Sequence, residues 1–147
     1  MFFLIPDALT MNKLFFLLFF FAGSACAADG VAVAGDDVAQ RIAAASVKQE
    51  VAADDPRVAQ TRKLLDKAVK LTREEPMAIA AACSRYAGHL FDSIHERATA
   101  LELLEALAAF GRSGRPMNET LQDYVAARKV APGKSHVEAM TKLGGKK

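Results

Sequence analysis

Residues 77–110, MAIAAACSRYAGHLFDSIHERATALELLEALAAF, form the longest stretch of the chain that stays apolar, helix-compatible and free of proline. At 100° per residue, the first half of the stretch places its large apolar side chains on one helical face and its polar side chains opposite. The apolar face carries Ile79, Cys83, Tyr86, Ala87, Leu90 and Ile94. This pattern indicates an amphipathic helix that packs one side against a core.

The apolar face does not continue in phase through the second half of the stretch. Three large residues fall on the former polar side: Leu103, Leu107 and Phe110. One straight helix would therefore have to bury both faces in turn, so we expect two helices with a break between Asp92 and Thr99. Ser93 followed by Glu96 matches a capping box, which predicts that the second helix begins near Ser93.

Helix-start signals also occur on both sides of this stretch, as acidic residues before proline and as capping residues. The starts are marked by Asp36, by Asp55 with Pro56, by Glu75 with Pro76, by Asn118, and by Ser135 with Glu138. We expect the first of these helices, which is alanine-rich, to lie at the periphery. Because no stretch alternates as a half-buried strand does, the predicted fold class is all-α, a small bundle of about five helices within residues 36–143.

The N-terminal residues 1–27 have the pattern of an export signal. From Met11 onward, a short basic region precedes an apolar run and a small-residue cleavage pattern at residues 25–27. The apolar run is shorter than the roughly 20 residues that a membrane span needs. We therefore expect cleavage after Ala27, no transmembrane segment in the mature chain, and a periplasmic or secreted location.

Three further expectations concern the start of the chain, its terminal segments and the possible acylation of Cys26. Met11 is the better start, because residues 1–10 hold no basic residue. Residues 28–35 should form a flexible mature N-terminus, and residues 144–147 a disordered basic tail. A lipoprotein anchored through acylated Cys26 is an alternative to plain cleavage, although Gly23 occupies the place where a bacterial lipobox usually has an aliphatic residue.

Cleavage after Ala27 leaves Cys83 as the only cysteine of the chain. A lone thiol cannot form an internal disulfide, so the domain must be held together by helix packing. The position of Cys83 on the apolar face predicts a buried, inert thiol. An intermolecular disulfide in an oxidising compartment is the alternative.

One group of side chains has a spacing that suits a metal ion. His89, Asp92 and Glu96 stand at i, i+3 and i+7, which would place them on one face of a continuous helix. They are the candidate ligands of a periplasmic metal-binding or small-ligand-binding protein. The competing interpretation is a solvated helix face, because no second His or Glu pattern is available on a facing helix.

Catalytic and cofactor motifs are absent from the sequence, which holds no Gly-x-Ser-x-Gly, phosphate-binding Gly-rich loop, His-Glu-x-x-His or Cys-x-x-Cys. The basic helix face of Arg62, Lys63, Lys67, Lys70 and Arg73 lacks the interleaved aromatic residues of a nucleic-acid binder. We therefore expect a non-enzymatic protein of the cell envelope, without cofactor or nucleic acid. Its partner would be another protein or a second copy of the chain.

Overall fold

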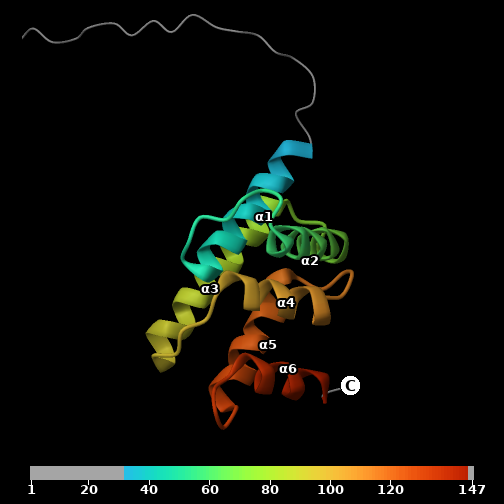
Figure 1. Ribbon diagram of the computed structural model, residues 1–147. Coiled ribbons are helices and arrows are strands. Elements are labelled where there is room, and N and C mark those ends of the chain that lie inside the picture. Colours follow the sequence, from blue (N-terminus) through green and yellow to red (C-terminus); the bar gives the residue numbers. More distant parts are fainter. Residues whose placement is uncertain (1–31, 146–147) are drawn as a thin grey trace, which may run out of the picture.

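The structure, a computed structural model, describes residues 32–145. All regular elements in this range are helices, which confirms the all-α prediction (Figure 1). They are α1 (Ala32–Val47), α2 (Pro56–Thr72), α3 (Pro76–Ile94), α4 (Ala100–Phe110), α5 (Met117–Val130) and α6 (His136–Gly144). The described range holds six helices, where a bundle of about five was expected.

The predicted chain ends fall mostly outside the described residues. The export signal of residues 1–27, with Cys26, and the last two residues of the predicted basic tail are not among them. Helix α1 begins at Ala32, so the second half of the segment expected to be flexible, residues 28–35, is helical. Helix α6 ends at Gly144, one residue beyond the predicted end of the domain.

Helix α4 lies at the centre of the described part of the chain and contacts each of its other helices. In Figure 1 it runs between α1 and α2 above and α5 and α6 below. Its side chains Leu103, Leu104 and Leu107 are completely buried. Replacing a buried leucine of this kind with alanine typically costs about 2–5 kcal/mol. The second half of the 77–110 stretch therefore forms the core around which the other helices pack.

The predicted break inside residues 77–110 is confirmed, since α3 ends at Ile94 and α4 begins at Ala100. His95 closes α3 in the left-handed conformation (φ 57°), and its backbone N–H donates to the Phe91 carbonyl at 2.9 Å. Thr99 caps α4, with its hydroxyl accepting from the Glu102 N–H and the Glu102 carboxylate accepting from the Thr99 N–H, both at 3.2 Å. These contacts complete a capping box.

The predicted capping box at Ser93 and Glu96 is wrong. Ser93 still belongs to α3, and its hydroxyl donates to the His89 carbonyl one turn earlier at 2.5 Å. A serine hydroxyl that donates to a carbonyl of its own helix is not placed to cap a new helix. The chain therefore holds two similar Ser/Thr-x-x-Glu patterns in succession, and α4 begins at the second.

The apolar faces predicted for the helices match the burial. On α3, Ile79, Cys83, Ala87 and Leu90 are buried, and Tyr86 and Ile94 are half-buried. Helix α1, however, is not peripheral: it packs on α2, α3 and α4 through Val38, Ala39, Ile42 and Ala43, all of them buried. Small alanine side chains let α1 approach its neighbours closely, so its weak hydrophobicity did not indicate an outer position.

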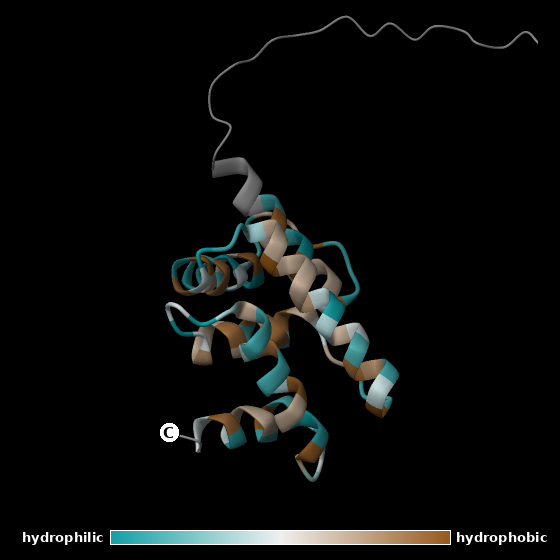
Figure 2. Ribbon diagram, turned by 180° about the vertical axis from the view of Figure 1, so that it is seen from behind, coloured by the Kyte–Doolittle hydropathy of each residue, from teal (hydrophilic) through white to brown (hydrophobic). Residues whose placement is uncertain are grey.

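The remaining helix starts follow the sequence signals with two exceptions, the first being α1, which begins at Ala32 and not at Asp36. Asp55 caps α2, with its carboxylate accepting from the Arg57 N–H at 2.8 Å, and Ser135 with Glu138 forms the predicted capping box of α6. Asn118 does not cap α5, because that helix already begins at Met117. Figure 2 shows the resulting pattern of hydrophilic loops between helices that alternate hydrophilic and hydrophobic residues.

Thr99→Ala tests the start of α4. Removing the capping hydroxyl leaves the Glu102 N–H without its partner, so we expect the free energy of unfolding to fall by about 1 kcal/mol. Ser93→Ala is the matched control and should change it by less than about 0.5 kcal/mol. Urea unfolding measures both, and an equal loss from the two variants would contradict this assignment of the capping box.

Candidate functional site

The structure does not bring the candidate metal ligands together. His89 and Asp92 are exposed on α3, but Glu96 lies beyond the end of that helix at Ile94, so it does not continue their face. The left-handed turn at His95 redirects the chain before Glu96. Within residues 32–145, no group of three or more His, Cys, Asp or Glu side chains is placed to hold a metal ion.

Cys83 is a free thiol in the core. Its side chain is completely buried, and this burial raises the pKa of the thiol to about 12. A thiol that neither reaches the surface nor ionises easily is a poor nucleophile and a poor disulfide partner. Its surroundings therefore favour the inert core residue over the intermolecular disulfide.

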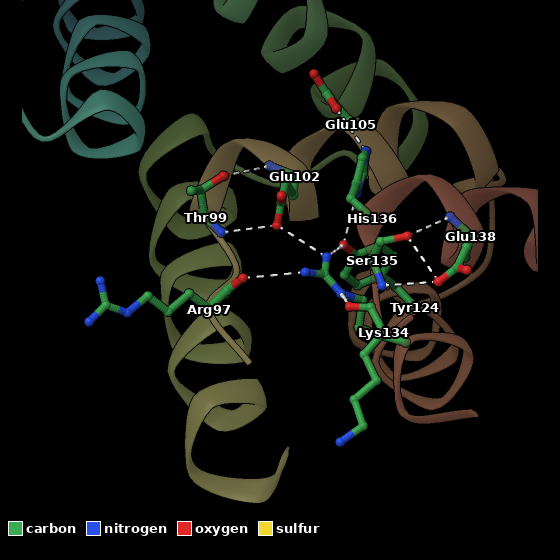
Figure 3. Close-up of polar contacts among 10 residues, drawn as sticks. Arg97, Thr99, Glu102, Glu105, Tyr124, Lys134, Ser135, His136 and Glu138 are labelled. Atoms are coloured by element: carbon green, nitrogen blue, oxygen red, sulfur yellow. Dashed lines mark hydrogen bonds and ion pairs between the residues drawn. The ribbon is translucent and has the colours of Figure 1, made fainter. Parts of the chain in front are cut away.

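A buried arginine lies at the centre of a cluster of polar side chains (Figure 3). The sequence analysis did not predict this cluster. We call Arg128, Glu102, Tyr124, His136 and Glu105 the Arg128 cluster. Arg128 is only 4% exposed, although its guanidinium carries a permanent charge. Its Nη1 donates to the Tyr124 hydroxyl at 2.7 Å and to the Glu102 carboxylate at 3.2 Å.

The other two nitrogens of Arg128 bind backbone carbonyls at the ends of neighbouring helices. Nη2 donates to the carbonyl of Arg97, in the connection between α3 and α4, at 3.3 Å, and Nε donates to the carbonyl of Lys134, just before α6. The guanidinium thus joins α5 to two loops and to α4. A buried charge is tolerated when its hydrogen bonds are satisfied in this way.

The hydrogen bonds continue from Tyr124 to α6 and back to α4. Because the Tyr124 hydroxyl accepts from Arg128, its own proton is left to donate to His136 Nδ1 at 2.8 Å. The remaining ring proton of His136 then lies on Nε2, which is 2.9 Å from the Glu105 carboxylate. His136 thus connects Tyr124 on α5 with Glu105 on α4.

A Glu–His–Tyr–Arg arrangement resembles a proton-transfer site in composition. In this cluster the tyrosine and the arginine are buried, whereas Glu102, Glu105 and His136 are partly exposed. Tyr124 is completely buried, and this burial raises its pKa to about 12. The three hollows described below are lined by other side chains. The contacts of the cluster join α4, α5 and α6. The i, i+4 pair of Tyr124 and Arg128 was the only signal of it in the sequence.

An apolar hollow lies between α1 and α3, and we call it the α1–α3 groove. It has a volume of about 280 Å³. Its lining residues are Val38, Arg41, Ile42, Ala45, Met77, Ala80, Ala81, Ser84 and Ala100. Met77 is 53% exposed, so a large apolar side chain stands open to solvent in the lining. Scattered exposed apolar residues are ordinary, but an apolar hollow with one in its lining is a candidate binding surface.

Two further hollows flank the loop between α4 and α5. One, of about 360 Å³, is lined by the end of α2 and by this loop, and the other, of about 310 Å³, includes Arg112, Asp123 and Leu143. Arg115 lines both. Its guanidinium is already bound to the carboxylates of Glu119 at 3.1 Å and Asp123 at 2.8 Å, so its charge is balanced within the chain.

Comparisons with known proteins add nothing to this geometry, since no family model, curated protein or solved structure matches the chain. Among residues 32–145, the helices are too short or too polar for any of them to cross a membrane.

The accessibility of Cys83 can be measured directly on a chain that begins at Ala28. Because the thiol is buried and its pKa is about 12, we expect it to react with a thiol reagent at least about a hundredfold more slowly in the native state than in urea. Cys83→Ser supplies the blank. Rapid labelling of the native protein, or a disulfide-linked dimer on a non-reducing gel, would contradict the buried assignment.

Tyr124→Phe tests the Arg128 cluster. The variant removes the donor to His136 and an acceptor of Arg128, so we expect it to lower the free energy of unfolding by about 1–3 kcal/mol. Tyr86→Phe is the matched control, because the Tyr86 hydroxyl makes only long, exposed hydrogen bonds of 3.4 and 3.5 Å. It should change stability by less than about 0.5 kcal/mol. Urea unfolding at neutral pH compares them, and equal losses would show that the cluster adds nothing specific.

Proposed function

We propose that the chain is an exported, non-catalytic interaction protein of the cell envelope, which binds another protein through the α1–α3 groove. The uncovered groove is the observation that carries this proposal. Exposed apolar surface is unfavourable in water, and covering it with a partner releases about 25 cal/mol for each Å² removed from solvent. The export part of the proposal is supported by the leader pattern of residues 11–27.

The charges around the groove favour an apolar partner. Arg41 is the only charged side chain in its lining, and its guanidinium pairs with the Asp37 carboxylate at 2.7 Å, one turn earlier on α1. The charge of Arg41 is therefore neutralised by Asp37 of the same chain, and no ligand is needed to balance it. Such a surface has nothing to attract a phosphate, a carboxylate or a metal ion, so its attraction comes from apolar contact.

Size also favours a protein over a small molecule. Pockets for small ligands usually hold about 300–1,000 Å³ and enclose most of the ligand. The groove, at about 280 Å³, lies at the lower limit and opens along the surface. The surface of a partner protein can cover such a hollow while packing on the helices that border it.

Co-purification tests the proposal with a variant pair. The chain with its own leader and a C-terminal tag is expressed in the cells from which it comes, and a charge is placed in the groove by Ala81→Glu. Because a desolvated carboxylate in an apolar groove is unfavourable, we expect the variant to lose the partner at all salt concentrations. The purified chain should have the mass of residues 28–147 together with the tag.

Lys67→Glu is the control for that pair, since Lys67 is exposed on α2, away from the groove lining. It should retain the partner. A wild-type chain that stays a partner-free monomer throughout, or a complex that survives Ala81→Glu, would contradict binding through the groove, and a mass that includes residues 11–27 would contradict processing of the leader.

A further inference from the structure

We propose that the turn between α5 and α6 docks on a membrane surface of anionic phospholipids. The residues that make the contact are called the α5–α6 corner: Lys129, Val130, Lys134, Val137 and the neighbouring Arg97. The proposal is carried by two exposed valines that lie among three basic side chains, on a turn that the Arg128 cluster holds in place. This surface is separate from the α1–α3 groove, so the proposal goes beyond the binding of a protein there.

Large apolar side chains stand open to solvent at this corner. Val130, the last residue of α5, is 60% exposed, and Val137, in the first turn of α6, is 72% exposed. They are the two most exposed large hydrophobic side chains of the described residues. A third, Phe91, is exposed near the end of α3. Figures 1 and 2 place the end of α3 and the turn between α5 and α6 at the end of the molecule away from α1 and α2.

Basic side chains flank the two valines. Lys129 comes directly before the first valine, and Lys134 lies three residues before the second. Arg97 lies beside this turn, because Arg128 binds the backbone carbonyls of both Arg97 and Lys134. Figure 3 shows the side chains of Arg97 and Lys134 pointing away from the cluster. None of the three basic side chains takes part in an ion pair with another described residue.

The carboxylates near the corner leave this positive charge available. Glu138 accepts a hydrogen bond from the Gly133 N–H at 2.8 Å, and the two carboxylates of the Arg128 cluster bind its arginine and its histidine. Asp92 and Glu96 lie near the end of α3, so the positive charge is concentrated at the turn between α5 and α6. Charge complementarity therefore favours an anionic surface at this turn.

The turn is held in position by the rest of the chain. Arg128 binds the Lys134 carbonyl, and the carboxylate of Glu138 binds the Gly133 N–H. A turn that is already ordered loses little conformational freedom when it binds. In a bilayer interface the valines would leave water while the basic groups meet lipid phosphates.

The small size of the corner favours a membrane over a folded protein. Stable protein interfaces use roughly 20–30 residues on each side. A membrane needs no matching shape, and apolar contact and charge attraction to anionic lipids add together at its surface. Two valines and three basic groups suit weak, reversible docking of this kind.

A tryptophan at the corner tests the docking, because the chain has no natural tryptophan. The tagged chain is purified from the cells from which it comes, as Val137→Trp or as Met77→Trp, and is mixed with vesicles of equal parts phosphatidylglycerol and phosphatidylcholine. We expect the emission of Val137→Trp to shift to shorter wavelength, because the indole enters the interface, and that of Met77→Trp to stay unchanged. Vesicles of phosphatidylcholine alone, or anionic vesicles in about 1 M salt, should give no shift.

Charge reversal separates the corner from general attraction between the chain and the vesicles. Lys129→Glu with Lys134→Glu should weaken binding to the anionic vesicles at least about tenfold in a flotation assay, since each basic group near such a surface contributes about fivefold. Lys63→Glu with Lys67→Glu makes the same change of net charge on exposed residues of α2. This control pair should weaken binding by less than about threefold, because it lies away from the contact.

Other outcomes overturn the proposal. Equal weakening by the two pairs would show an effect of net charge alone. A shift of Met77→Trp in place of Val137→Trp, or binding that does not depend on lipid charge, would show a different contact. A wild-type chain that ignores the vesicles refutes lipid docking, while co-purification with Ala81→Glu still decides the proposed interaction function separately.

Discussion

The carboxylate of Glu102 performs two tasks on which the rest of the fold depends. It accepts the Thr99 N–H at 3.2 Å, which fixes the start of α4, and it accepts Arg128 Nη1 at 3.2 Å, which fixes α5 against α4. One side chain thus connects a local helix start with the packing of distant helices. A helix as short as α4 is marginal by itself, so its cap and its burial have to support each other. The three buried leucines of α4 lie in the helix that this cap begins, and α4 contacts every other helix of the described part of the chain.

The burial of Arg128 then determines how the C-terminal helices are arranged. A guanidinium removed from water requires acceptors on all sides, and here they come from α4, from α5 and from the loops before α4 and α6. These acceptors lie close together only in one arrangement of the helices. Apolar packing alone is less selective, since leucines and alanines can often exchange neighbours at small cost. The polar cluster therefore specifies the arrangement, while the leucines of α4 supply most of the driving force for burial.

Local patterns predicted the helices and their buried faces because periodicity and helix starts are encoded in adjacent residues. The same reasoning failed at Ser93 and Glu96, which match a capping box as well as Thr99 and Glu102 do. Glu102 also contacts Arg128, but Arg128 lies 26 positions further along the chain, so no local pattern indicates this contact. The metal-ligand hypothesis assumed that α3 continues to Glu96, whereas α3 ends at Ile94. The Arg128 cluster and the α1–α3 groove each combine residues of separate helices, so their existence depends on which helices pair, and no local pattern reports that.

The position of α4 also divides the described part of the molecule into two ends. The α1–α3 groove lies at one end, and α6 packs mainly on α5 and α4 at the other, through Ala139 and Leu143 and through His136. Local unfolding can open such an end without disturbing the rest, and hydrogen exchange detects openings of this kind. A fusion or an insertion placed after α6 would accordingly leave the opposite end intact. The C-terminal helix is thus the natural place at which evolution, or an experimenter, could attach a new module to this scaffold.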